Sequence, residues 1–237
     1  MKDFRRYGAG ALLLASLVSI SAAGAPIILD AVDSGAYFDN GTHNPGIENY
    51  LTGLFSGQEH RSFFVFDLSS VTGTIQAATL RLFNPEVSQF LHGYVSPDPT
   101  ETLNIYDVST PAADVTLNAA GVAGFNDLGP GTLYGSKTVS AADNGTVVEI
   151  AVGNAAIADL NAATGLFLLG GALGTIGVGD QYVFGFSMAS FVDDHTRQLV
   201  LDVTSVPEPS ALSLLMTSLL LGVACAGRGR RSLMPEN

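Results

Sequence analysis

Short segments in which apolar residues alternate with polar ones, or gather into brief apolar runs, recur along most of the chain. Alternation puts the apolar side chains on one face of a strand, and a short apolar run between polar residues is typical of a strand buried on both faces. Clusters of Gly, Pro, Asn and Asp, such as residues 96–99, separate these segments and favour turns. The pattern predicts strands over residues 27–31, 61–67, 79–83, 102–106, 147–150, 165–169, 181–186 and 197–203.

One segment has helical spacing instead. Between Asn154 and Ala162, Ala156 and Leu160 fall on one side of a helix, and Asn154 is a suitable N-terminal cap. Many short strands and a single helix indicate an all-β fold, either a β-sandwich or a jelly roll. We expect one such domain over residues 26–205, which is long enough to bury a core without disulfides.

The N-terminus has the pattern of a secretory signal peptide. Three basic residues stand among the first six, and the uncharged apolar run Ala9–Ile20 and several small residues follow. We predict a signal helix over residues 1–23, with signal peptidase cutting after Ala23 rather than after Ala25, because Pro26 stiffens the backbone behind the second position. An uncleaved membrane anchor is the alternative.

The C-terminus has a second targeting pattern. Residues 211–227 form an apolar stretch of 17 residues, at the short edge of the length that spans a bilayer as a transmembrane helix. Arginines follow it, and positive charge favours the cytoplasmic side. Because the N-terminal signal directs the middle of the chain out of the cytoplasm, both ends predict the same topology. The basic tail, residues 228–231, contains Arg228, Arg230 and Arg231.

The motif Pro207, Glu208, Pro209 comes immediately before this apolar stretch. The order of motif, Leu-rich helix and basic tail over residues 206–237 resembles the PEP-CTERM sorting signal of Gram-negative bacteria. The resemblance implies a transient stay in the inner membrane, cleavage by an exosortase, and release or transfer to the cell surface or extracellular matrix. Such signals accompany exopolysaccharide production and biofilm formation. An ordinary single-pass anchor is the alternative.

The composition of the middle domain argues against several classes of binding partner. Residues 26–205 contain four basic and 19 acidic residues, a formal charge of −15, whereas the whole chain has −12. This charge argues against binding to nucleic acid or to an anionic membrane, and it repels polyanionic sugars unless a cation bridges. The one cysteine, Cys225, lies in the C-terminal apolar stretch, so a disulfide framework is excluded.

A second resemblance covers most of the middle domain. It is carried by Arg61–Ser69, Ala77–Phe83 and Arg197–Val203, in that order along the chain. These segments look like the DNRLRE-type jelly-roll domains of secreted bacterial proteins, which are related in shape to carbohydrate-binding modules. The resemblance implies a jelly-roll β-sandwich and, where such domains bind a ligand, a polysaccharide.

Aromatic residues in predicted loops are the candidates for contact with a glycan, because the C–H faces of sugars pack on flat rings. We select Tyr37, Tyr50 and Tyr94 as the platform, with Phe38 and Tyr134 as further candidates. The alternative is that these rings plug the ends of the sandwich.

Carboxylates near both ends of the domain suggest a structural calcium ion. Asp30 and Asp33 lie near its first strand and Asp202 in its last, and such strands often neighbour each other in a jelly roll. Calcium binds carboxylate and carbonyl oxygens. The alternative is a solvated acidic rim, because the chain lacks a D-x-D-x-D-G loop.

Nothing in the sequence forms a recognisable catalytic motif. The histidines, among them His43 and His60, are not spaced as a metal-binding pair, and Ser62 is not in a G-x-S-x-G turn. The predicted strands contain three arginines, Arg61, Arg81 and Arg197. We expect each to pair with a carboxylate such as Asp67 or Asp202, which is a structural role rather than ligand binding. The sequence therefore predicts a non-catalytic exported protein associated with exopolysaccharide. A carbohydrate-binding module is the alternative.

Overall fold

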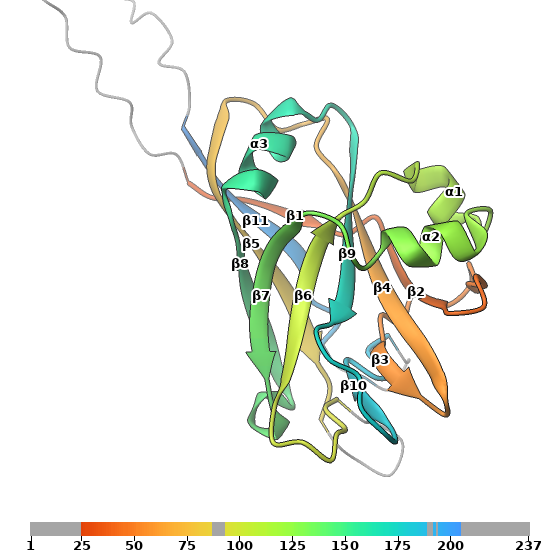
Figure 1. Ribbon diagram of the computed structural model, residues 1–237. Coiled ribbons are helices and arrows are strands. Elements are labelled where there is room, and N and C mark those ends of the chain that lie inside the picture. Colours follow the sequence, from red (N-terminus) through yellow and green to blue (C-terminus); the bar gives the residue numbers. More distant parts are fainter. Residues whose placement is uncertain (1–24, 87–92, 189–191, 193, 205–237) are drawn as a thin grey trace, which may run out of the picture. The chain divides into compact units, whose positions relative to one another are not determined.

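A computed structural model describes residues 25–86, 93–188, 192 and 194–204. These residues form two antiparallel β-sheets that pack face to face, with few helices (Figure 1). The predicted all-β sandwich is confirmed at this level.

The smaller sheet has four strands in the order β1-β11-β5-β8. Its strands are β1 (Ile27–Asp30), β11 (Arg197–Thr204), β5 (Thr74–Asn84) and β8 (Thr146–Val152). The first and last strands of the domain are neighbours, as the sequence predicts, because Ile27 lies opposite Leu201 in the β1–β11 pair.

The larger sheet contains the remaining seven strands. Its main path is β10-β3-β4-β9-β6-β7, and β2 pairs with the free side of β4. The bounds of these strands are β2 (Asp33–Phe38), β3 (Thr52–Phe55), β4 (Gln58–Asp67), β6 (Glu101–Asp107), β7 (Leu133–Val139), β9 (Leu166–Leu173) and β10 (Gln181–Val183).

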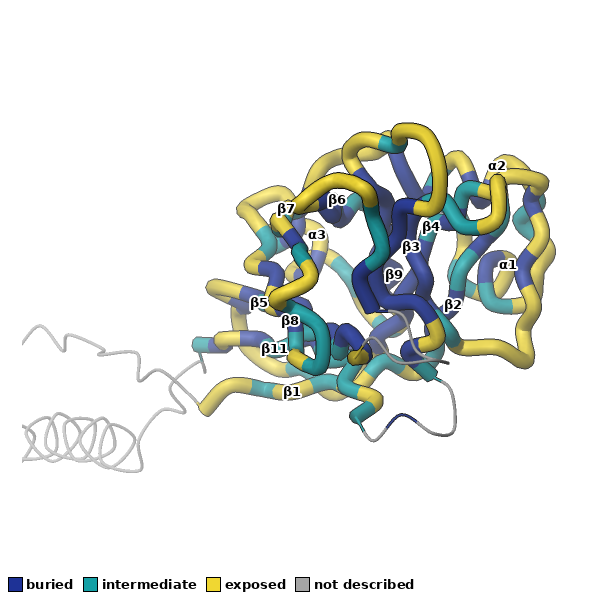
Figure 2. The backbone as a smooth tube through the Cα atoms, turned by 90° about the horizontal axis from the view of Figure 1, so that it is seen from below, coloured by how far each residue is buried: buried dark blue, intermediate teal, exposed yellow. Residues whose placement is uncertain are grey.

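The main hydrophobic core lies between the two sheets. Alternate residues of the smaller sheet, such as Leu80 and Leu201, face Phe64 and Ile105 of the larger one, and all four are fully buried. Burial of this apolar area is the principal stabilising contribution to the fold. Figure 2 shows the buried residues gathered in the strands and the exposed ones in the loops and along the helices.

A second, smaller core covers the outer face of the larger sheet. Two short helices, α1 (Ala112–Thr116) and α2 (Gly121–Asp127), pack on β2, β4 and β9. Phe63 and Val65 of β4 therefore point into this second core while Phe64 points into the first. This double burial explains the unbroken apolar run in β4, a pattern expected of strands covered on both faces.

The predicted helix is confirmed as α3 (Asn154–Ala162). Its cap differs from the prediction, because Gly153 is the N-terminal cap and makes no side-chain hydrogen bond. A 3₁₀ turn, η1 (Ala141–Asp143), precedes β8 and is closed by a capping box from Ser140. The strand predicted over residues 181–186 ends at Val183, where the chain turns at Phe184 with φ 59°.

Long strands separate the two ends of the sandwich. In β5, Thr74 lies opposite Thr204, whereas the side chain of Asn84, at the other end, accepts a hydrogen bond from Phe184 N at 3.0 Å. A strand of 11 residues is about 35 Å long. The described chain therefore starts and finishes at one end of the sandwich, and the segment after β10 lies at the opposite end.

The terminal helices of the sequence analysis fall outside the described residues. The predicted signal helix (1–23), the PEP motif (207–209), the transmembrane stretch (211–227) and the basic tail (228–231) belong to these parts. Within the described ranges, no helix has the length and apolar character needed to span a membrane.

Candidate functional site

A pocket of about 250 Å³ lies at the end of the sandwich away from Thr204, beside the β3–β4 hairpin. Strands β2, β3 and β4 contribute to its wall, and two loops complete it. Among the lining residues are Phe38, His43, Asn49, Phe55, His60 and Phe186.

Strand register brings the aromatic part of this wall together. Ser56 and Gly57 form the two-residue turn of the β3–β4 hairpin, with φ of 52° and 78°, as in the tight turns that join antiparallel strands. Phe55 pairs with Gln58 and Phe38 pairs with His60, so their side chains share one face of the larger sheet.

The rings of this wall lie in edge-to-face or tilted contact with one another. The centroid of His60 lies 4.6 Å from that of Phe38 and 6.2 Å from that of Phe55. Phe55 in turn lies 6.4 Å from Phe186, which is 36% exposed. Such a wall presents apolar ring surface to the cavity, next to the amide side chains of Asn44 and Asn49.

Two buried histidines supply the polar character of the pocket. His43 Nδ1 lies 3.1 Å from the carbonyl oxygen of Ala36, and His60 Nδ1 lies 3.0 Å from that of Gln58. Since a carbonyl oxygen only accepts, Nδ1 of each ring is the donor. Burial lowers the pKa of both imidazoles below the ordinary value, so both rings are neutral at pH 7.

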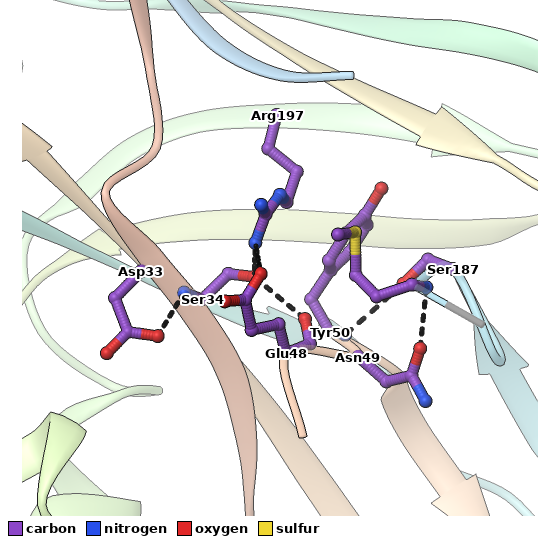
Figure 3. A network of polar contacts seen from close by, with 8 residues as sticks. Asp33, Ser34, Glu48, Asn49, Tyr50, Ser187 and Arg197 are labelled. Atoms are coloured by element: carbon purple, nitrogen blue, oxygen red, sulfur yellow. Dashed lines mark hydrogen bonds and ion pairs between the residues drawn. The ribbon is translucent and has the colours of Figure 1, made fainter. Parts of the chain in front are cut away.

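A network of polar contacts fixes the loop that closes the pocket (Figure 3). Arg197 of β11 donates from Nη1 to Ser34 Oγ at 2.6 Å and to Glu48 Oε2 at 2.7 Å. Ser34 Oγ donates to the carbonyl oxygen of Glu48, also at 2.7 Å. The loop is thereby tied to both sheets at once, since Ser34 is in β2 and Arg197 in β11.

The same loop is tied to the segment that carries Phe186. Asn49 Oδ1 accepts a hydrogen bond from Met188 N at 2.6 Å, and Ser187 Oγ accepts one from Tyr50 N at 3.3 Å (Figure 3). These contacts hold the two loops of the pocket together.

Phe186 has an uncommon backbone conformation. Its φ is 55°, in the left-handed region that is uncommon for bulky residues. Such strain persists where the surrounding structure fixes it, and it occurs often at binding sites. Here it accompanies the placement of an aromatic ring at the rim of the pocket.

The tyrosines predicted to form a glycan platform are buried. Tyr37 and Tyr50 are 0% exposed and Tyr94 is 7% exposed. Their hydroxyl groups donate to the main-chain carbonyl oxygens of Val115, Phe83 and Asp98, respectively. The prediction is therefore wrong at these positions, because rings that fill the core offer no face to a sugar.

The carboxylates predicted to share calcium do not come together. Asp30 lies opposite Gln198, whereas Asp202 is four residues further along β11, about 13 Å away along the strand. Asp33 is in the other sheet and accepts a hydrogen bond from Ser34 N at 2.8 Å. Over the described ranges, no three His, Cys, Asp or Glu side chains are grouped to hold a metal ion.

The arginines form ion pairs, as predicted, but with other partners. Arg61 pairs with Glu59 at 2.9 Å, Arg81 with Glu149 at 3.1 Å, and Arg197 with Glu48 at 2.7 Å. Asp67 and Asp202, the predicted partners, have no part in these pairs.

Sequence reasoning missed the pocket because its residues are far apart in the chain. The sequence offers Phe38 only as a loop aromatic, and it offers His43 and His60 only as histidines without metal-binding spacing. The hairpin signal that would have helped, Ser56-Gly57 between Phe55 and Gln58, identifies the register of β3 against β4. It says nothing about β2 or Phe186.

A scan of the sequence against protein-family models finds no match, and a search among curated proteins finds no significant match.

Proposed function

We propose that this protein is a non-catalytic exported protein of a Gram-negative bacterium, sorted by the PEP-CTERM pathway to the cell surface or extracellular matrix. The support is the order of sequence features at its two ends, from the N-terminal signal to the motif Pro207, Glu208, Pro209 and the terminal arginines. Signal peptidase and an exosortase are its processing partners. The middle domain is a jelly-roll-like sandwich that works after export.

We further propose that the pocket holds a sugar unit of an exopolysaccharide. The observation that carries this function is the combination of aromatic wall and polar groups in one cavity. Phe38, Phe55 and Phe186 offer apolar surface to the C–H groups of a sugar, while Asn49 offers an amide that both donates and accepts hydrogen bonds.

Affinity electrophoresis of the processed protein, in gels containing the exopolysaccharide of the producing cells, tests this function. We expect the polymer to retard the wild-type protein and Phe55→Ala to lose most of that retardation, because the variant removes one wall of the pocket. Loss of a packed aromatic contact of this kind weakens binding by about tenfold.

Leu166→Ala is the matched control. Leu166 is 57% exposed and pairs with Asp67 at the far end of β4, roughly 23 Å along the strand from His60. It should leave the retardation unchanged. Equal migration of wild type and Phe55→Ala in the polymer gel would contradict a glycan site in this pocket.

A further inference from the structure

We propose that the pocket recognises one electrically neutral sugar ring, and that Nε2 of His43 and Nε2 of His60 accept hydrogen bonds from its hydroxyl groups. This inference rests on the proposed glycan-binding function and specifies its ligand class. Because these two acceptor atoms are uncharged, they favour a neutral sugar over a uronic acid.

The first step is the hydrogen-bonding state of the two rings. Because Nδ1 of each neutral imidazole donates to a main-chain carbonyl, the proton is on Nδ1 and Nε2 carries a lone pair. Neither Nε2 atom makes a hydrogen bond of normal geometry to another described residue, although the main chain of Gly53 also acts on the His60 ring. Every fully buried polar side-chain atom of the described residues has a hydrogen-bond partner. Because the two Nε2 atoms make no such bond, they are not fully buried.

The second step is that both rings line the same cavity. Tyr37 stacks on His43 with ring centroids 5.3 Å apart, and Phe38 contacts His60 edge to face. Each imidazole is thus held in place by an aromatic neighbour and a main-chain carbonyl. The result is a pair of fixed acceptor atoms, which suits a ligand that carries more than one hydroxyl donor.

The third step is charge. Asp33 is the carboxylate that acts electrostatically on His43, and Asp39 acts on His60. Both favour the protonated ring, but burial outweighs them and lowers the pKa of each imidazole. Neutral acceptors beside two carboxylates offer no counter-charge to an anionic sugar, which the net charge of −15 in residues 26–205 also repels.

The fourth step is size. A cavity of about 250 Å³ is smaller than the roughly 300–1,000 Å³ of pockets for drug-sized ligands. It therefore suits one ring rather than a stretch of polymer. Phe186, placed at the rim by its strained backbone, supplies apolar surface for the C–H groups of that ring.

The test titrates the wild-type protein with methyl glycosides of neutral hexoses and with the corresponding uronic acids, and follows the imidazole proton signals by NMR. We expect at least one neutral glycoside to shift the signals of both histidines, and its uronic acid to bind at least about tenfold more weakly. Equal binding of a hexose and its uronic acid would overturn the inference.

Two variants of His60 distinguish the effect of its hydrogen-bond acceptor from the effect of the shape of its ring. His60→Phe keeps a ring but removes the acceptor, and His60→Gln keeps an acceptor near the position of Nε2. We expect affinity to fall about tenfold in His60→Phe and to be largely restored in His60→Gln, as for loss of one hydrogen bond. Unchanged affinity in His60→Phe would overturn the role of this nitrogen.

The wild-type protein also tests the acceptor role without any substitution. Because the pKa of each imidazole is lowered from 6.5, affinity should be constant from about pH 8 to about pH 6.5 and fall in more acidic solution, where Nε2 gains a proton and ceases to accept. Affinity that stays constant through the pH range in which the NMR signals show the rings gaining a proton would contradict the proposal.

The outcomes distinguish this inference from the function on which it rests. Retardation by polymer that depends on Phe55 but not on His60 supports the glycan site and overturns the histidine role. If wild-type protein neither migrates more slowly in polymer nor binds a glycoside, the proposed function is overturned together with the inference.

Discussion

Individual aromatic residues show how far burial decides the role of a side chain. Tyr50 is fully buried, and its O–H donates to the carbonyl oxygen of Phe83 at 2.9 Å. Burial raises the pKa of Tyr50 well above its ordinary value, so it stays neutral over the physiological range. Its ring joins the main core beside Phe64 and Phe184, with centroids 5.3 and 5.4 Å away.

Tyr50→Phe should therefore lower the free energy of unfolding by about 1–2 kcal/mol, because it leaves a buried carbonyl oxygen without its donor. Chemical denaturation at neutral pH measures the effect. Tyr106→Phe is the control, since Tyr106 is only half-buried and its hydroxyl has no hydrogen bond to another described residue. A loss no larger than that of the control would show that the Tyr50 hydroxyl contributes little to the core.

The sequence alone does not distinguish a buried tyrosine of this kind from a tyrosine in an exposed loop. Tyr37 and Tyr50 both lie near turn-forming residues, which suggests exposed loops, yet Tyr37 lies in β2 and Tyr50 next to β3. Their burial depends on helix α1 and on β5, which contact them from distant parts of the chain. No local pattern contains that information.

At the level of elements, Arg197 connects parts that the strand ladders leave separate. It belongs to the smaller sheet, while Ser34 lies in the larger sheet and Glu48 in the pocket loop. Its side chain is only 15% exposed, so its interactions are less screened by solvent than those of an ion pair on the surface. Removing it would leave the Ser34 hydroxyl and the Glu48 carboxylate without a common partner.

We expect Arg197→Met to destabilise the protein by about 2 kcal/mol, because a largely buried charged donor is lost. Arg81→Met is the matched control. The Arg81–Glu149 pair lies across β5 and β8, with side chains 31% and 60% exposed, and should contribute less than about 1 kcal/mol. Urea denaturation of both variants checks the difference, and equal losses would argue against the bridging role of Arg197.

The strands that the sequence predicted are those with clear alternation or an apolar run. Residues 197–203, with Leu199, Leu201 and Val203 on one face, became β11, and the run around Phe64 became β4. Strand β2 was missed because its sequence, Asp33–Phe38, is short and mixes small and polar residues. It is held in place by pairing along β4 rather than by its own propensity.

The two short helices were missed for a related reason. Helices as short as α1 and α2 are not stable alone and depend on packing against the sheet. At β9, Gly170 permits this packing, because a side chain there would come within 2.7 Å of the Leu128 carbonyl oxygen. The only sign of this close approach in the sequence is the glycine itself. Because a glycine within a strand can have several causes, it does not predict that a helix packs there.

For the whole molecule, the two ends of the sandwich carry different features. The described chain begins near Ile27 and ends at Thr204, and both lie at one end of the smaller sheet, since Ile27 pairs with Leu201. The β3–β4 hairpin is at the other end (Figure 1). The pocket lies beside this hairpin. A protein processed at both ends would keep its pocket away from the processing sites.

Replacing Pro207, Glu208 and Pro209 together by alanine should leave the protein unprocessed at its C-terminus and held in the membrane fraction, because the proposed exosortase loses its recognition motif. Mass spectrometry of the protein from cells and medium fixes both mature ends and so measures the effect. Alanine replacement of Ser232, Leu233 and Met234, beyond the basic tail, serves as the control. Normal processing of the motif variant would count against the sorting prediction.

The antiparallel pairing of β11 with β5, from Arg197 opposite Leu82 to Thr204 opposite Thr74, has a mechanical consequence. Suppose that flow pulls on a polymer caught in the pocket while the chain is held beyond Thr204. The force then acts parallel to the strands. The hydrogen bonds between β11 and β5 are therefore loaded in shear at the same time, rather than broken one after another. Under such a load the β11–β5 ladder resists rupture more strongly than it would if the same two strands were peeled apart from one end.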